Sequence, residues 1–287
     1  MSIVATSTPQ AFTLQAPSSP PRAQLRLLEG TCPRTNTVKR LAEILDKEFT
    51  VLVRGTPSSG KTTLATLLHN YCKARGDRVV YISGWRVEYH GIETLTSECE
   101  RAGYRGIQIE IFSNVDITFI IDEAQDSYGD TGLWNFIKAQ NNKHPGPKIC
   151  LFSSYGSPSS GMVPRRHFTP DSFHITQRVS IIRSPVTDAP DICLFYNETE
   201  FEDVVKRYCM NPTTRLSLDN AAWTYLFSIT NGHPGAVISM LSYIFKVFTS
   251  RRFLIDEMLI AIDIWISIQA WPHSAHHGRR SRKSARR

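Results

Sequence analysis

A short run of the chain places two glycines, a lysine and a hydroxyl side chain at the spacing G-x-x-x-x-G-K-[ST]; its residues are Gly55, Thr56, Pro57, Ser58, Ser59, Gly60, Lys61 and Thr62. Glycine lacks the Cβ atom that would stop a backbone curl from closing around an anion. Lys61 can bring positive charge to the β- and γ-phosphates of a nucleoside triphosphate, and the Thr62 hydroxyl can complete a magnesium shell. The spacing therefore predicts that Gly55 to Thr63 bind ATP or a related triphosphate with Mg²⁺, rather than forming an ordinary Gly/Ser turn.

Two adjacent carboxylates, Asp122 and Glu123, follow the apolar run 117–121. A carboxylate at the end of a buried strand can hold magnesium, usually through water. The glutamate beside it can orient and deprotonate an attacking water. We therefore expect Asp122 to hold the metal together with Thr62, and Glu123 to act as general base beside Lys61. The simpler alternative is that the pair only ends the strand or begins a helix.

Further polar residues are candidates for the transition state. Ser154, with Ser153 close behind, follows the apolar run 149–152 and can sense the γ-phosphate or the lytic water. Turn chemistry at the end of a strand explains these serines nearly as well. Arg165, Arg166 and Arg178 can supply positive charge to a transferred phosphoryl group, although a solvated surface position is the more common fate of arginine.

The segment Gly232-His233-Pro234-Gly235 lies between two expected helices. It can be a helix break in which Pro234 is the first residue of the next helix. It can also reach the nucleotide, with His233 and Pro234 contacting a phosphate or the base. A single histidine does not decide between the two interpretations.

Five apolar runs must carry these motifs: 49–53, 79–82, 117–121, 149–152 and 179–182. Continuous apolar runs are typical of strands that are buried on both faces of a parallel sheet. Helical spacing of apolar residues appears near 38–45, 64–71 and 93–102, between or before these runs. Strands that alternate with helices predict an α/β fold with a parallel sheet of about five strands.

The pattern changes after about residue 190, where helical stripes cover 201–208, 222–229 and 237–248 and Asp219 is a plausible N-cap. The expected organisation is therefore a disordered leader (1–29), a P-loop NTPase domain (30–189) and a small helical lid (190–250). An amphipathic helix (251–272) and a basic disordered tail (273–287) follow.

Charge and composition limit the partners. Lys and Arg exceed Asp and Glu by 7 in this chain of 287 residues, but six of the basic residues lie in 279–287. Nucleic acid is therefore expected to bind only through 278–287, where a disordered tail or a nuclear localisation signal is the favoured alternative. The longest apolar stretch, 253–271, contains three acidic residues, which argues against a membrane span. Scattered cysteines and no visible signal peptide predict an intracellular protein, cytoplasmic or nuclear.

Several strings form a combined pattern: Val53–Thr63, Ile121–Tyr128, Leu133-Trp134, Leu151–Pro158, Gln177–Ser180 and Gly232–Val237. This pattern resembles crinkler-type P-loop NTPases of fungi and oomycetes over roughly residues 30–248. The resemblance implies an ATPase of the STAND or AAA-like (ASCE) group, with an extra strand between the nucleotide motifs, a helical lid and contact of His233 with nucleotide. Family members often add a nuclease-like domain. Neither that domain nor the oomycete translocation motif is expected here, which argues against a DNA-cleaving effector.

Together these features predict an ATPase switch. Nucleotide state would move the helical domain against the sheet domain and gate a protein partner or a second copy of the chain. Two alternatives stay open: a nucleotide-dependent binding module without turnover, and a nucleic-acid-associated protein that binds through its basic tail. The sequence does not distinguish ATP from GTP.

Overall fold

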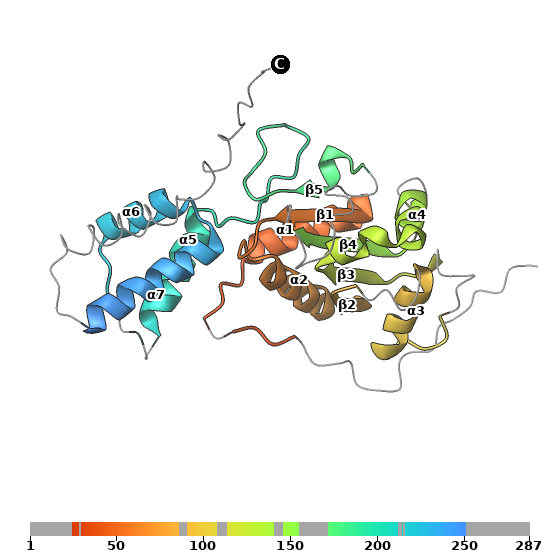
Figure 1. The fold of residues 1–287 in the computed structure, drawn as a ribbon, viewed down its shortest axis with the longest axis horizontal. Helices are drawn as coiled ribbons and strands as arrows, with labels where there is room; N and C mark the ends of the chain where they lie inside the picture. The colour runs from red at the N-terminus through yellow and green to blue at the C-terminus, as the bar shows by residue number, and fades with distance from the viewer. Residues whose placement is uncertain are drawn as a thin grey trace, which may run out of the picture.

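The computed structural model describes residues 25–28, 30–85, 91–107, 114–140, 146–154, 172–211, 214 and 216–250. Figure 1 shows a layered α/β unit beside a smaller group of helices. The expected helix 251–272, the basic tail, Arg165 and Arg166 lie outside the described residues. The same is true of the expected leader up to residue 24. The last residues of the expected leader are among those described. Leu25 is held by the Asn70 side chain, which accepts the Leu25 N–H and donates to the Leu25 carbonyl, each at 2.8 Å.

Five parallel strands form one sheet in the order β2-β3-β4-β1-β5. They are β1 (Thr50–Gly55), β2 (Val79–Ser83), β3 (Thr118–Asp122), β4 (Lys148–Ser154) and β5 (Arg178–Val179). The parallel α/β fold class is therefore confirmed. β4 is the extra strand, because it lies between β1, which precedes the Gly/Lys loop, and β3, which ends in the acidic pair.

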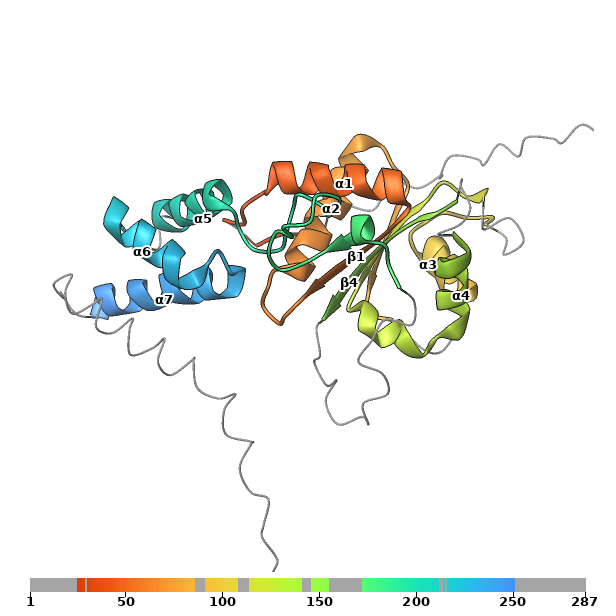
Figure 2. The same ribbon diagram turned by 90° about the horizontal axis from the view of Figure 1, so that it is seen from above.

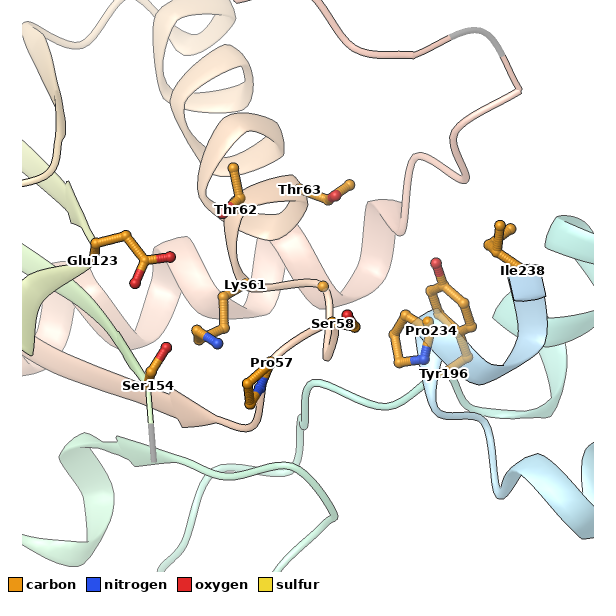
Figure 3. Close-up of a pocket in the computed structure, with 12 residues that line it drawn as sticks. Pro57, Ser58, Lys61, Thr62, Thr63, Glu123, Ser154, Tyr196, Pro234 and Ile238 are labelled. Carbon is orange, nitrogen blue, oxygen red and sulfur yellow. The ribbon is translucent and has the colours of Figure 1, made fainter. Parts of the chain in front are cut away.

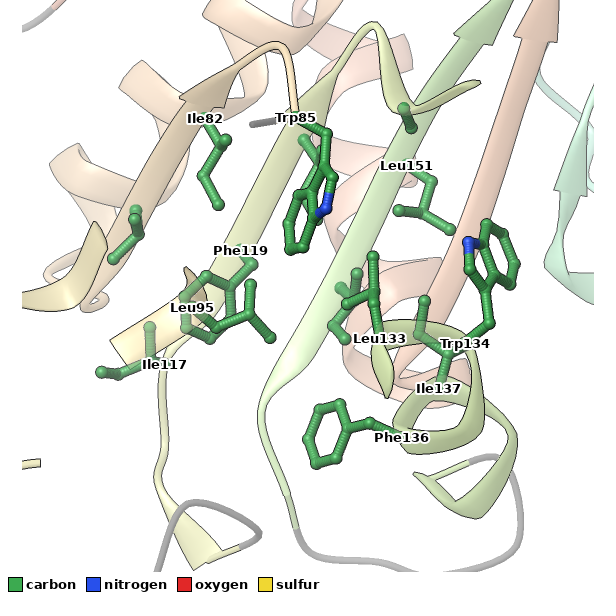
Figure 4. Packing of buried hydrophobic residues seen from close by; sticks show 14 of the residues in the cluster. Ile82, Trp85, Leu95, Ile117, Phe119, Leu133, Trp134, Phe136, Ile137 and Leu151 are labelled. Atoms are coloured by element: carbon green, nitrogen blue, oxygen red, sulfur yellow. The ribbon is translucent and has the colours of Figure 1, made fainter. Parts of the chain in front are cut away.

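Alternate residues of each strand face opposite layers, as a period of two requires. Val51 and Val53 of β1 pack with α1 (Thr35–Glu48) and α2 (Lys61–Arg75), while Leu52 packs on the other face with α3 (Ile92–Arg101) and α4 (Thr131–Gln140). Figure 2 shows the two pairs of helices on opposite sides of the sheet. In Figure 4, Phe119 and Leu151 of the central strands meet Leu133 of α4. Helices therefore bury both faces of the sheet, which explains why the strand sequences are continuously apolar.

Two parts of this unit differ from the sequence-based expectation. β5 is shorter than the expected 179–182, because Ser180 and Ile181 accept hydrogen bonds from the backbone N–H groups of Leu194 and Phe195 instead of continuing the sheet. The helix α4 and the short 3₁₀ helix η2 (Ala124–Gly129) were not expected from periodicity.

The helical unit consists of α5 (Glu198–Met210), α6 (Asn220–Thr230) and α7 (Pro234–Ser250). It has an apolar core of its own, to which Val205, Leu226 and Leu241 contribute. The Asp219 carboxylate accepts the Ala222 N–H at 2.7 Å, so the predicted N-cap of α6 is confirmed. No helix in the described part of the chain is long and apolar enough to cross a membrane.

A buried ion pair joins the two units. Arg34, which precedes α1, pairs with Glu200 of α5 at 3.0 Å, and both side chains are less than a tenth exposed. The Arg34 guanidinium also donates to the carbonyl oxygens of Cys193, Leu194 and Phe195 in the connecting segment. Arg34, at the start of the α/β unit, therefore holds in place the segment 193–195 that leads into α5.

Candidate nucleotide-binding site

A cavity of about 600 Å³ opens where the carboxyl edge of the sheet faces the helical unit. Its lining comes from both units, as Figure 3 shows. The lining residues are Pro57, Ser58, Gly60, Lys61, Thr62, Thr63, Glu123, Ser154, Tyr196, Pro234, Gly235 and Ile238. The structure thus brings most of the predicted loop together with Glu123, Ser154 and Pro234.

The loop between β1 and α2 curls as the glycine spacing requires. Gly60 is left-handed with φ 86°, and it precedes α2 without a side-chain cap on the first N–H groups of that helix. Uncapped N–H groups at a helix N-terminus attract anions. A Cβ atom at Gly55 would lie 2.4 Å from Leu194 and 2.5 Å from the Ser59 hydroxyl, so only glycine lets the curl close here. The loop therefore fits a phosphate chain.

The Lys61 ammonium donates to the carbonyl oxygens of Gly55 at 3.2 Å and Thr56 at 2.9 Å. Burial lowers the pKa of Lys61, while the nearby charges of Glu123 and Asp122 oppose that shift. The side chain lies with its nitrogen between the loop and the end of β4 (Figure 3). A partly buried positive charge beside the uncapped N-terminus of α2 favours the binding of an anion.

The two acidic residues have different surroundings. Asp122 is buried, and its carboxylate accepts the Tyr81 hydroxyl and the Glu123 N–H, each at 3.1 Å. Glu123 has a left-handed backbone with φ 51° and lines the cavity on the side of Lys61 and Thr62 (Figure 3). Asp122 is not among the residues that line the cavity.

Oxygen donors suit magnesium, which is held by few protein ligands and keeps several waters. In the ranges that the structure describes, no cluster of three or more His, Cys, Asp or Glu residues is placed to hold a metal. A site made from the Thr62 hydroxyl, Asp122 and phosphate oxygens needs no such cluster. The Thr62 hydroxyl and the carboxylates of Asp122 and Glu123 are oxygen donors of the kind that Mg²⁺ prefers, and of these Thr62 and Glu123 line the cavity.

At the end of β4 the structure separates two serines. Ser154 lines the cavity, and its N–H donates to the Gln125 side chain at 2.9 Å. Ser153 is fully buried and shares a hydrogen bond of 2.6 Å with the Tyr128 hydroxyl. Arg178 does not line the cavity, and its guanidinium donates to the Phe173 carbonyl at 2.8 Å.

The segment 232–235 approaches the loop, but through its proline and last glycine. Pro234 begins α7, which is one of the two interpretations of this segment, and it would lie 3.3 Å from a Cβ atom at Gly60. The Gly235 N–H donates to the Ser58 carbonyl at 3.0 Å. His233 does not line the cavity; its Nδ1 accepts the Ala236 N–H at 3.2 Å and caps α7.

Some lining residues were missed by sequence reasoning. Tyr196 lies in an irregular segment and Ile238 on the exposed side of α7, so neither stands out in a periodic pattern. Gly235 does carry a signal: glycine is unfavourable inside a helix unless another group approaches closely. A Cβ atom there would lie 2.6 Å from Ser58 Cβ.

No family model and no curated protein matches the chain. Among solved structures, it is similar to a Walker-type ATPase of Pyrococcus abyssi at 14% identity, over 84% of this chain and 76% of that one, with a TM-score of 0.44. A likeness at this level assigns no residue. The crinkler-type resemblance accordingly stays a prediction from the motifs, and the site rests on its own geometry.

Proposed function

We propose that the chain binds a nucleoside triphosphate with Mg²⁺, ATP being the expected one, and hydrolyses it. One observation carries the proposal: a glycine-bounded curl with a buried ammonium faces Glu123 and Ser154 across one cavity. The curl supplies backbone donors for phosphate oxygens, and Lys61 supplies charge. Thr62 and Asp122 would hold the magnesium ion, which neutralises phosphate charge when it is bound.

Hydrolysis needs a group that takes a proton from water, and we assign this role to Glu123, which lines the cavity together with Lys61. The water oxygen forms a bond to the γ-phosphorus while the bond to the β,γ-bridging oxygen breaks, and the nucleoside diphosphate leaves with that electron pair. Glu123 takes the proton of the water, and the Ser154 hydroxyl can hold the water or a γ-phosphate oxygen. General base catalysis of this kind contributes about 100- to 10,000-fold.

The contact between α7 and the loop supports a switch. Because the Gly235 N–H bonds the Ser58 carbonyl, a loop that changes shape with the γ-phosphate must move α7 or break this bond. We propose that nucleotide state thereby shifts the helical unit and gates a protein partner or a second copy of the chain. A ligand can shift such an equilibrium only as far as it binds one arrangement more tightly.

Phosphate release and nucleotide affinity should be measured for wild type, Lys61→Ala and Glu123→Gln. We expect Lys61→Ala to bind nucleotide on the order of 100-fold more weakly, and Glu123→Gln to bind normally while releasing phosphate at least about 100-fold more slowly. Glu202→Gln is the matched control, because this glutamate lies on the exposed face of α5. A Glu123→Gln variant with the wild-type rate would show that another group is the base. Tight binding without release by wild type would favour the binding module instead.

A further inference from the structure

Gln125 joins the two strand ends that face the cavity. It lies in η2, directly after the acidic pair, and its side chain reaches back toward the sheet. The amide Nε2 donates to the Glu123 carboxylate at 2.5 Å, and the amide Oε1 accepts the Ser154 N–H at 2.9 Å. One side chain therefore bridges the residue that follows β3 and the last residue of β4.

Chemistry alone fixes the orientation of this amide. A carboxylate only accepts hydrogen bonds, and a backbone N–H only donates them. The amide nitrogen must therefore face Glu123 and the amide oxygen must face Ser154. Reversing the amide would bring two oxygens together at one end and two donors together at the other.

Glu123 needs such a partner to stay in one place. Its backbone is left-handed, a conformation that non-glycine residues adopt infrequently and that tends to occur at functional sites. Its carboxylate is attracted toward Lys61, while Asp126, whose pKa is raised by burial and by the Glu123 charge, repels it. A short hydrogen bond from a neutral amide holds the carboxylate between these charges and adds no charge of its own.

We propose that Gln125 is a positioning residue for the general base. Its amide holds the Glu123 carboxylate at the cavity wall and ties it to the Ser154 backbone, so that the base and the end of β4 keep one spacing. This inference rests on the proposed hydrolysis. Since the contact is made to the base and not to the loop that binds phosphate, its loss should lower kcat and leave nucleotide affinity unchanged.

The decisive variant is Gln125→Met, which keeps the length of the side chain and removes both polar ends. We expect kcat for phosphate release to fall about 10- to 100-fold, as the loss of a hydrogen bond to a charged group predicts. The Kd for a fluorescent ATP analogue should stay within about twofold of wild type. Ser127→Ala is the matched control: it removes another buried hydrogen bond of η2, to the Ala124 carbonyl, and contacts neither Glu123 nor Ser154.

A double-mutant cycle separates positioning from general loosening. If Gln125 acts through Glu123, adding Gln125→Met to Glu123→Gln should lower the single-turnover rate no further. Additive losses would overturn the proposal. Should Gln125→Met fail to fold, Gln125→Ala answers the same question, because it also removes both hydrogen bonds and adds no charge beside Glu123. A wild-type kcat in that variant would also overturn it.

The two proposals fail in different ways. If wild type binds nucleotide and releases no phosphate, the proposed hydrolysis is wrong and the positioning role falls with it. If wild type and Ser127→Ala are equally active and Gln125→Met matches them, only the role of Gln125 is wrong. The expected pattern is an active wild type, an active control and a slow Gln125→Met variant with unchanged affinity.

Discussion

The two sides of the cavity differ in chemistry. The side from the α/β unit carries the charged groups Lys61 and Glu123, at positions set by hydrogen-bonded strands and by the loop after β1. The side from the helical unit carries Tyr196, Pro234 and Ile238, and no charged residue. Under the proposed function, the charged sheet side would bind phosphate, and the uncharged helical side would cover the bound nucleotide.

The largest expected effect concerns the junction that keeps the two sides together. Arg34→Leu would leave the Glu200 carboxylate buried without its cation. The Thr37 hydroxyl and the Asn197 N–H would then be its hydrogen-bond donors. Losing one member of a buried pair destabilises by about 3–5 kcal/mol. Urea unfolding measures this. Arg40→Leu is the control, since its ion pairs are exposed and worth less than about 1 kcal/mol. Equal losses in both variants would mean that the units are joined some other way.

The second effect tests the charged side alone. Lys61→Ala should weaken nucleotide binding on the order of 100-fold, because a charge-assisted contact to phosphate is lost. Its free energy of unfolding should not fall, since burial already disfavours the ammonium. Lys206→Ala on the surface of α5 serves as the control for removing a lysine. If calorimetric titration gave Lys61→Ala the wild-type affinity, the charged side of the cavity would not be the side that binds phosphate.

The contact between the two sides is the next target. Gly235→Ala puts a methyl group 2.6 Å from Ser58 Cβ and 2.8 Å from the Ser58 carbonyl oxygen, so the loop or α7 must shift. Overpacking of this kind costs about 1–3 kcal/mol, partly offset by the better helix propensity of alanine. We expect a lower unfolding midpoint and weaker nucleotide binding. Gly129→Ala, which meets nothing within 4 Å, should show neither change.

A smaller effect tests the uncharged side. Tyr196→Leu removes an aromatic ring from the wall and should weaken nucleotide binding about 10-fold, with kcat unchanged. Stopped-flow binding and phosphate release measured together distinguish the two parameters. Tyr243→Leu, on α7 and outside the cavity lining, is the control. A fall in kcat without a change in affinity would place Tyr196 in the chemistry and break the comparison.

The smallest effect is a dependence on pH at the start of α7. Burial lowers the pKa of His233 from 6.5, and its Nδ1 accepts the Ala236 N–H, so the folded state favours the neutral ring. As pH falls below 6.5 the unfolded chain takes up the proton first, and the free energy of unfolding decreases. His233→Asn keeps a capping oxygen and does not titrate. Urea unfolding from about pH 7.5 to about pH 5.5 should therefore depend less on pH in this variant. If the free energy of unfolding depended on pH as much in His233→Asn as in wild type, the effect would belong to another group such as His69. Burial lowers the pKa of His69 as well.

The same comparison explains what the sequence could predict. The strands and the charged side were accessible, because apolar runs such as 117–121 and the spacing of Gly60 and Lys61 are local patterns with one physical cause each. The N-cap Asp219 was a local feature too, and it is confirmed; the start of α7 at Pro234 agrees with one of the two interpretations of its segment. The roles predicted for Lys61, Glu123 and Ser154 stay predictions, although all three line one cavity.

What could not be predicted depends on contacts between distant segments. Tyr196 lies in a connecting segment that is held by Arg34 and by its own N–H bond to the Gly232 carbonyl. These partners are distant in the sequence, so no pattern around residue 196 predicts its place in the cavity. The bridge made by Gln125 requires the ends of β3 and β4 to be neighbours, which follows from strand order and not from spacing along the chain. β5 is shorter than expected because the backbone of Leu194 and Phe195, rather than a sheet strand, bonds to the carbonyls of Ser180 and Ile181.

The position of β4 has one more consequence. With β4 between β1 and β3, the lysine loop and the acidic pair are two strand spacings apart, about 10 Å. Main-chain geometry sets this width, so the apolar residues of the sheet can be exchanged extensively without altering it. A slip of β4 by one residue would be different: it would turn the Ser153 side chain toward the cavity and Ser154 away from it. The arrangement of the cavity therefore depends more on the alignment of this one strand than on the identity of its core residues.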